Sequence, residues 1–275
     1  MNKESEKILV TGGTGLVGAR LVPRLIEAGF ACMTLVRNEK DVPAGATAVE
    51  ADLLDASSLA AVKDVSAIVH LAAVFRTQDT DLIWKSNVEG TRNLINAART
   101  HTPHSRFILA STAHVYKKNN PHPGREDDPV VPQQAYPASK LTAENELRES
   151  GLNWSILRFP FVYGDGDEHL ETLPQHIIAA KWHPAMRMST IHHRDIATAV
   201  HMALRGEMDS RMVNISDEAP TSLYELARLV GVTIESSSDP LPNPWHLHID
   251  SSLARSLGFQ PAVRTVYQAV QEKLL

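Results

Sequence analysis

Three glycines between a short apolar strand and a helical pattern constrain this chain more than any other feature of its sequence. In the segment LVTGGTGLVGARL, Gly12, Gly15 and Gly18 follow a strand expected over 7–12 and open a helix expected over 16–28. The first glycine permits a tight turn, the second lets a ligand approach the backbone, and the third lets helix and strand pack closely. Backbone N–H groups and the positive helix end then face an anion. The pattern indicates a pyrophosphate-binding loop, with a glycine-rich connection that binds nothing as the alternative.

Strand-like and helical segments alternate through the first two-thirds of the chain. Further strands are expected at 32–37, 46–52, 66–73, 106–111 and 153–159. Helices are expected near 57–62, over 81–100 and from residue 135 onward. Strand–helix–strand units in series form right-handed crossovers and a parallel sheet covered on both faces. The predicted fold class is α/β, with a doubly wound parallel Rossmann sheet.

The pattern of segments changes after Tyr163, where loops and short helices replace the regular alternation. We expect residues 1–164 to form the dinucleotide-binding domain, with 191–216 returning to it as a helix over 191–204 and a short strand. Residues 165–190 and 217–275 are expected to form a small, discontinuous C-terminal substrate-binding cap. A helix in that cap is predicted to start at Thr221 or Ser222 and to stop at Gly231.

Composition and charge are those of an ordinary globular protein. Of 275 residues, 43% are hydrophobic and 21% charged, and the net charge of −5 favours neither nucleic acid nor an anionic membrane as partner. The single Cys32 excludes an intramolecular disulfide. Because the chain starts without a signal-peptide core and has no apolar run long enough for a bilayer, we expect a cytoplasmic protein.

Thirteen histidines raise the question of a metal site. The groups at 101–104, 192–193 and 246–248 lack an accompanying cluster of Cys or Glu and a strand or helix that would bring them together. We therefore expect no bound metal.

Tyr136 and Lys140, in the segment AYPASKLTAENEL, are candidates for a proton-transfer pair. They stand four residues apart, about one helical turn, so both side chains leave the same face of a helix. A free tyrosine has a pKa near 10, which an adjacent ammonium and the positive nicotinamide of an oxidised cofactor lower. Ser111 and Thr112, after the fifth strand, are candidates to hydrogen-bond the same substrate oxygen. In isolation, however, the Tyr-x-x-x-Lys pattern also fits a solvated helix.

Arg37 and Asn38 end the second predicted strand, where dinucleotide-binding folds commonly place an acidic residue that holds the ribose hydroxyls. A guanidinium cannot accept a hydroxyl proton, but it suits a 2′-phosphate bidentately. The sequence thus favours NADP(H) as cofactor. The alternative is NAD(H), with Arg37 as a surface residue above the site. Asp52 and Leu53, which end the third strand, are expected near the adenine.

Nine stretches of the sequence, some of them already described, together resemble the pattern of a known family. They are TGGTGLVG (11–18), DL (52–53), HLAA (70–73), NVEGTRNL (87–94), STAHVY (111–116), YPASK (136–140), LRFPFVYG (157–164), IHHRDIATAV (191–200) and DSSLARSLGFQP (250–261). In order and spacing they resemble the extended branch of the short-chain dehydrogenase/reductase superfamily. This branch comprises NAD-dependent nucleotide-sugar epimerases and dehydratases and the dihydroflavonol-reductase-like enzymes.

The resemblance implies a role for particular residues. Thr112 would orient the substrate oxygen, Tyr136 would act as acid and base, and Lys140 would also bond the nicotinamide ribose. The expected cofactor-binding residues are Gly12, Thr14, Gly15, Leu16, Val17, Gly18, Arg37, Asn38, Asp52, Leu53, Leu71, Ala72, Ala73, Asn87, Tyr136, Lys140, Pro160 and Val162. The expected substrate-binding residues are Phe75, Thr112, His114 and Arg187. His193 and Asp195 are expected to be mainly structural. The family often dimerises through helices that correspond to 81–100 and 137–150, so a homodimer is expected.

The implied activity is NAD(P)-dependent interconversion of a hydroxyl and a carbonyl by hydride transfer, on a small or sugar-like substrate. Ala113 and His114 stand where the nucleotide-sugar dehydratases of this group carry Asp-Glu, which argues against a dehydratase of that type. One alternative is an NAD-dependent nucleotide-sugar 4-epimerase, against which Arg37 and the short C-terminal part argue. The other is a non-catalytic dinucleotide sensor, against which the intact set of Thr112, Tyr136 and Lys140 argues.

Overall fold

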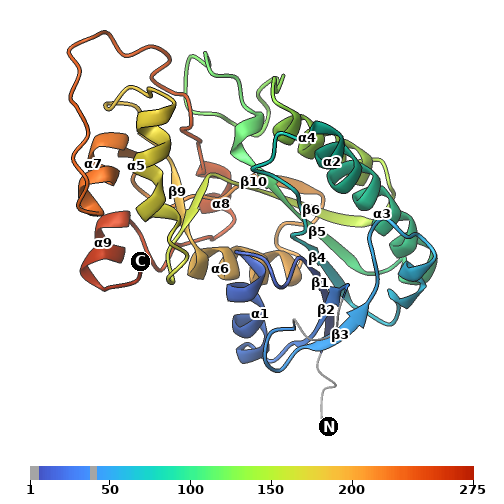
Figure 1. Ribbon diagram of the computed structural model, residues 1–275. Coiled ribbons are helices and arrows are strands. Elements are labelled where there is room, and N and C mark those ends of the chain that lie inside the picture. Colours follow the sequence, from blue (N-terminus) through green and yellow to red (C-terminus); the bar gives the residue numbers. More distant parts are fainter. Residues whose placement is uncertain (1–5, 38–41) are drawn as a thin grey trace. The chain divides into compact units, whose positions relative to one another are not determined.

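The structure is a computed structural model that describes residues 6–37 and 42–275. Its centre is a seven-stranded sheet with the order β10-β6-β5-β4-β1-β2-β3 (Figure 1). The strands are β1 (Lys7–Thr11), β2 (Ala31–Val36), β3 (Thr47–Glu50), β4 (Ala67–His70), β5 (Arg106–Thr112), β6 (Asn153–Phe159) and β10 (Arg211–Asn214). The pairings β1–β2, β1–β4, β2–β3 and β4–β5 are parallel. The predicted α/β fold with a doubly wound Rossmann sheet is therefore confirmed.

The strand order reverses at β1, and this reversal determines where a ligand can bind. From β1 the sheet grows through β2 and β3 on one side and through β4, β5 and β6 on the other. Ligands of open α/β sheets bind at the carboxyl ends of the strands, at such a switch point. Thr11, the last residue of β1, lies opposite His70, the last residue of β4. The glycine loop and the segment after His70 therefore leave the sheet side by side.

Helices cover both faces of this sheet. Helix α1 (Gly18–Glu27) lies on one face, and α2 (Thr80–Trp84), α3 (Gly90–His101) and α4 (Ala135–Arg148) lie together on the other (Figure 1). One hydrophobic cluster joins α3 and α4 to the strands; it includes Leu9, Ile68, Leu94, Ala98, Phe107, Leu109, Ala143 and Leu147. Its helical members recur every four residues, which is the spacing of one helix face. Burial of each large side chain contributes on the order of 2 kcal/mol to stability.

The single helix predicted over 81–100 is interrupted in the structure. It starts as α2, capped by the Asp79 carboxylate, which accepts a hydrogen bond from Leu82 N at 2.9 Å. A π-helical turn follows over Lys85–Glu89, and α3 continues from Gly90. The hydroxyl of Thr91, in the first turn of α3, donates to the carbonyl of Asn87 within the π-helical turn at 2.6 Å. Hydroxyl bonds of this kind bend helices, and π turns often occur at functional sites.

The C-terminal part of the chain adds helices around a second core. These helices are α5 (His169–Ala179), α7 (Leu223–Leu229), α8 (Ser252–Ser256) and α9 (Val266–Gln271). The core includes Leu170, Leu173, Ile177, Leu223, Leu226, Val266 and Ala269. Helix α7 is preceded by Ser222, which forms a capping box with Glu225. The helix predicted to start at Thr221 or Ser222 thus begins at Leu223, with Ser222 as its N-cap.

The helix predicted over 191–204 begins later than expected. Residues Thr190–His192 form a strand, β9, which pairs in parallel with β7 (Phe161–Tyr163). Helix α6 then runs over His193–Leu204. The prediction was wrong for the first two residues because periodicity does not reveal the pairing of Ile191 with a strand almost thirty residues away. A second small pairing joins β8 (Arg187–Met188) to β11 (Thr221–Ser222).

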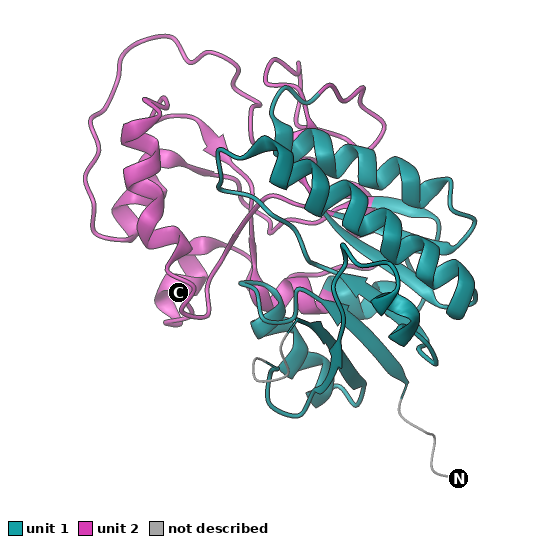
Figure 2. Cartoon of the chain, turned by 45° about the vertical axis from the view of Figure 1, so that its right-hand side comes forward, with its two compact units in different colours: residues 1–111, 132–157, 199–212 teal, residues 112–131, 158–198, 213–275 magenta. Residues whose placement is uncertain are grey.

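By compactness the chain divides into two units (Figure 2). The first unit comprises residues 1–111, 132–157 and 199–212, and the second comprises 112–131, 158–198 and 213–275. The chain passes between them inside β5, β6, α6 and β10 and in the segment around residue 131. The second unit thus takes in 112–131 and 158–164, which the sequence assigns to the dinucleotide domain. The functional division into a cofactor domain and a substrate cap remains a prediction.

Within residues 6–37 and 42–275, none of the helices combines the length and the apolar character that crossing a bilayer requires.

His70 lies at the centre of a buried polar chain in the first unit. Its side chain is fully buried, with Nδ1 2.6 Å from Thr11 Oγ1 and Nε2 2.9 Å from Thr91 Oγ1. Burial, with a further contribution from the positive Lys140, lowers the pKa of His70 to about 3. The imidazole therefore stays neutral and links β1, β4 and α3.

We predict that His70 makes the protein sensitive to acid. As the pH falls from 6.5 toward 3, the unfolded chain binds a proton at His70 that the folded chain does not. The free energy of unfolding then falls by about 1.4 kcal/mol per pH unit from this group alone. Urea denaturation between pH 5 and pH 7.5 measures it, with His70→Gln as the test and the exposed His104→Gln as the control. Equal pH dependence in His70→Gln and the wild type would contradict the prediction.

Candidate active site

The glycine loop between β1 and α1 is packed against backbone on two sides. Gly12 has a φ of +69°, and a Cβ added there would lie 2.7 Å from Ala72 N. A Cβ at Gly18 would lie 2.1 Å from the carbonyl oxygen of Gly12. Gly15 N donates to Gly12 O at 3.0 Å, which closes the turn. Gly12 and Gly18 therefore occupy positions where a side chain does not fit, as the tight turn and the close helix–strand packing require.

The open side of this loop suits a phosphate group. Thr14 and Gly15 are exposed, Leu16 and Val17 are half-buried, and the first turn of α1 contains no acidic residue. The first N–H groups of a helix have no partner within it and carry partial positive charge. The residues present thus fit the pyrophosphate of a dinucleotide.

The residues predicted around the adenosine differ in what they contact. Arg37 directly follows β2 and is exposed, whereas Asn38 lies outside the described residues. The carboxylate of Asp52 accepts a hydrogen bond from Leu54 N at 2.9 Å and so stabilises the turn after β3. Leu53 packs against the first core, and its carbonyl accepts from Asn93 at 2.9 Å. Of these residues, Arg37 has the most exposed side chain.

The segment after β4 is held by the strand beside it and by a buried amide. Leu71 N donates to Thr11 O at 3.1 Å, and Ala72 N donates to Thr11 Oγ1 at 3.3 Å. Asn87 is fully buried, and its amide nitrogen donates to Val74 O at 2.9 Å and to Ser139 Oγ at 3.0 Å. Both N–H groups of the Asn87 side-chain amide thus donate hydrogen bonds to acceptors within the protein. We therefore assign Asn87 a positioning role, since it joins the loop to helix α4.

Helix α4 carries the predicted proton-transfer pair. Tyr136 is partly exposed, and its ring lies 5.7 Å from the ring of Phe75 at an angle of 40°. Lys140, one turn further along, is only 2% exposed. Burial lowers the pKa of Lys140 to about 8, and the carboxylate of Glu144 opposes this effect. The two residues thus combine an accessible phenol with a buried amine.

Glu144 is a component of the site that sequence reasoning missed. Its side chain is 1% exposed and accepts a hydrogen bond from the hydroxyl of Ser111 at the end of β5. The sequence contained a signal, because Tyr136, Lys140 and Glu144 recur every four residues on one helix face. This hydrogen bond also distinguishes Ser111 from Thr112, the two residues that the sequence offered for binding the substrate oxygen. Ser111 serves Glu144, which leaves Thr112 as the candidate for the substrate oxygen.

The remaining predicted site residues belong to the second unit. Thr112 is the last residue of β5, and its Oγ1 accepts from the N–H of His114 at 3.2 Å. Pro160 lies between β6 and β7, and the carbonyl of Val162 accepts from His169 Nδ1 at 2.7 Å. Arg187 is exposed at the start of β8. His114 and Arg187 are therefore both residues of the second unit.

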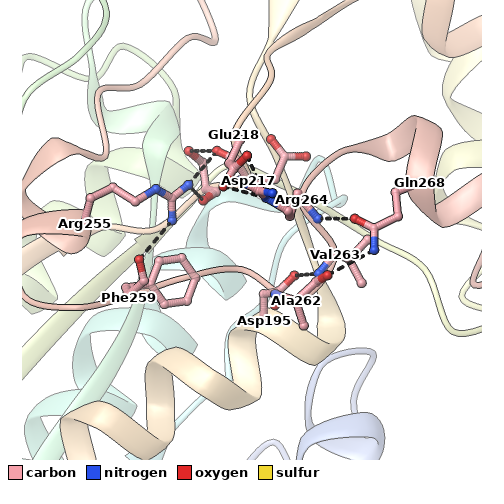
Figure 3. Close-up of polar contacts among 10 residues, drawn as sticks. Asp195, Asp217, Glu218, Arg255, Phe259, Ala262, Val263, Arg264 and Gln268 are labelled. Atoms are coloured by element: carbon pink, nitrogen blue, oxygen red, sulfur yellow. Dashed lines mark hydrogen bonds and ion pairs between the residues drawn. The ribbon is translucent and has the colours of Figure 1, made fainter.

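His193 and Asp195, expected to be structural, anchor other segments of the second unit. His193 Nε2 lies 2.8 Å from the carboxylate of Asp167, and both side chains are 1% exposed. Asp195 accepts from Ala262 N at 2.6 Å and from Val263 N at 3.1 Å (Figure 3). Burial raises the pKa of Asp195 to about 6. Its backbone bonds fix the C-terminal segment to α6.

In the described part of the chain, groups of three or more His, Cys, Asp and Glu side chains arranged to hold a metal ion were not found.

The fold and the glycine loop define a dinucleotide-binding α/β protein, and the Tyr136–Lys140 pair places it among the short-chain dehydrogenases/reductases. The model of the NAD dependent epimerase/dehydratase family matches residues 8–216. The chain belongs to this family, and the resemblance inferred from the sequence is confirmed.

Individual relatives have different activities. A UDP-glucose 4-epimerase of Azospirillum brasilense is 31% identical over 58% of this chain and 50% of its own length. A dTDP-6-deoxy-L-talose 4-dehydrogenase (NAD(P)(+)) of Kitasatospora kifunensis is 27% identical over 97% of this chain and 94% of its own. A short-chain dehydrogenase/reductase superfamily protein of Agrobacterium tumefaciens, solved with bound NAD, is 25% identical with a TM-score of 0.80, covering 97% and 95% of the two chains. The family is thus one of NAD-dependent enzymes, whose members catalyse different reactions.

We predict that Glu144→Gln lowers the pKa of Lys140 by about one pH unit, because the carboxylate that favours the ammonium is lost. ¹³C NMR of labelled lysine measures the titration. Glu146→Gln is the matched control, since it removes the same charge from the same helix but from a carboxylate that pairs with Arg92 at the surface. An unchanged Lys140 titration in Glu144→Gln would refute the coupling.

Proposed function

We propose that the protein is an NADP(H)-preferring oxidoreductase that interconverts a hydroxyl and a carbonyl on a small or sugar-like substrate. The observation that carries this proposal is the buried Lys140, one helical turn from the accessible Tyr136. A buried amine costs stability unless it is used or paired, and here Glu144 supports it. Such a perturbed group beside a tyrosine is typical of a catalytic site.

Tyr136 exchanges the proton in this mechanism. In oxidation its phenolate accepts the proton of the substrate hydroxyl, and in reduction the phenol donates it back. A positive charge one helical turn from a phenol favours the phenolate, and exclusion of water would strengthen this interaction. The Thr112 hydroxyl donates a hydrogen bond to the same substrate oxygen. The glycine loop would hold the dinucleotide, whose nicotinamide would supply or accept the hydride.

The pKa of Lys140 sets one limit on the working pH. Below about 8 the side chain is mostly the ammonium, and above it the amine predominates. A function that depends on the ammonium is therefore present at neutral pH and is lost as the pH rises through about 8.

We predict that Tyr136→Phe lowers kcat for carbonyl reduction by on the order of a hundredfold or more, the usual contribution of a positioned acid. The affinity for NADPH changes little, because the ring remains. NADPH oxidation with a panel of aldehydes and ketones measures turnover. Tyr267→Phe, an exposed tyrosine on α9, is the control. Turnover near the wild-type rate in Tyr136→Phe would exclude the proposed role.

We predict that Arg37→Ala weakens NADPH binding at least about tenfold and NADH binding much less, because a bidentate contact to the 2′-phosphate is lost. Fluorescence titration of nucleotide-free protein measures both affinities. Arg99→Ala, an exposed arginine on α3, is the control. Equal losses for the two nucleotides would contradict the role of Arg37.

The same preparation tests the alternative reaction. Protein denatured after purification releases whatever dinucleotide it retains. NAD that leaves only on denaturation would contradict the NADP(H) preference and would support a 4-epimerase, which regenerates its cofactor within each turnover.

A further inference from the structure

A small pocket lies within the second unit, between the segment that follows Thr112 and the loop that precedes α8. Its polar lining comes from His114, Lys117, Asn120, His246 and His248, and Trp245 adds an indole ring. No pattern in the sequence links residues 246–248 to His114, and the histidines at 246–248 were considered there only as metal ligands. The pocket brings the three imidazoles together.

Backbone bonds fix the two segments that form the pocket. Gly124 N donates to His248 O at 2.9 Å, and Asp250 N donates to Gly124 O at 2.8 Å. The side-chain amide of the buried Asn214 donates to Gly124 O and to Asp250 O, both at 3.0 Å. On the other side, Ser189 N donates to Leu247 O at 3.0 Å. The lining side chains therefore project from a fixed frame.

The pocket starts at the residue next to the substrate-orienting threonine. Ala113 lines it and directly follows Thr112, and the N–H of His114 donates to Thr112 Oγ1 at 3.2 Å. A substrate whose oxygen is held by Thr112 thus has another part within reach of His114 and its neighbours.

Lys117 brings a positive charge to this pocket, and the three imidazoles, whose pKa values burial lowers, are neutral near pH 7 and each carry one N–H donor. Burial, with further contributions from Lys118 and His114, lowers the pKa of His246 to about 4. Burial and Arg187 lower the pKa of His248, against the opposing Asp250. His248 Nδ1 is buried and has no hydrogen-bond partner within the described residues.

The carboxylates near the pocket have their own partners. Asp128 accepts from Asn120 at 2.7 Å and from Arg125 N at 2.9 Å. Asp250 accepts from Arg125 at 3.3 Å. Glu126 accepts from Asn214 N at 2.8 Å. Their charges are thus already engaged, and the lining itself contains no carboxylate among the residues that form it.

We propose that this pocket binds an anionic oxygen group, a carboxylate or a phosphate, on the substrate whose reacting oxygen Thr112 orients. The inference rests on the proposed function and adds the chemical class of the substrate. Lys117 and the imidazole N–H groups donate to the anion, and Trp245 packs against the adjoining apolar part.

Calorimetric binding to the full-length protein loaded with NADP⁺ tests this assignment. The probes are 4-formylbenzoate, its neutral methyl ester and 4-formylphenyl phosphate, which separates a carboxylate from a phosphate preference. We expect at least one anionic probe to bind about tenfold or more tighter than the ester. The preference falls in Lys117→Met and in His246→Ala. It persists in Lys63→Met and His104→Ala, which remove the same groups from exposed positions elsewhere.

Equal binding of ester and anions would overturn the assignment, as would a preference that survives both Lys117→Met and His246→Ala, or no binding of any probe at millimolar concentration. Since binding does not require proton transfer, the anion preference should also persist in Tyr136→Phe. Failure of the proposed catalysis and failure of the pocket are thus distinguishable: the first appears as turnover in Tyr136→Phe, the second as loss of the anion preference in the wild type.

Discussion

The close backbone contact between the glycine loop and the segment after β4 is the constraint on which the first unit depends. Gly12 meets Ala72 so closely that a Cβ has no room, and Gly18 meets the carbonyl of Gly12 in the same way. These contacts fix where α1 begins after β1, and they keep the carboxyl ends of β1 and β4 side by side. Thr11 then reaches His70, which in turn reaches Thr91 on α3. The conformation of the glycine loop at the switch point thus results from packing that only glycine permits.

The buried lysine on helix α4, Lys140, is the feature that suits the first unit to proton-transfer chemistry. Burial lowers the pKa of Lys140, and the carboxylate of Glu144 limits this lowering. The hydroxyl of Ser111 in turn donates a hydrogen bond to Glu144. The carboxylate is itself buried and satisfied, so the pair needs the hydroxyl at the end of β5 to remain intact. Asn87 fixes the same helix through Ser139. Helix α4 is therefore positioned by polar bonds from two sides, which holds Tyr136 on its exposed face.

The second unit organises a different set of segments by the same means. Asp195 binds two successive backbone N–H groups near the C-terminus, and Asn214 joins Gly124 to Asp250 (Figure 3 shows the first of these). Each buried polar side chain ties segments that are tens of residues apart. In a unit with short strands, such bonds take over part of the positioning that a large sheet provides elsewhere. The histidine-lined pocket depends on this framework.

The sequence by itself determined the fold class, which follows from the alternation of strand and helix patterns along the chain. It also determined the glycine loop and the Tyr136–Lys140 pair, because each follows from spacing within a single segment. Only the tertiary structure decided what depends on distant segments. It showed Ser111 bonded to Glu144, the amide of Asn87 committed to protein acceptors, and β9 in place of a helical turn. It also placed His246 beside His114. The spacing of residues along the sequence shows which face of a helix or strand each residue occupies. Which residue packs against that face depends on how distant parts of the chain fold back onto it.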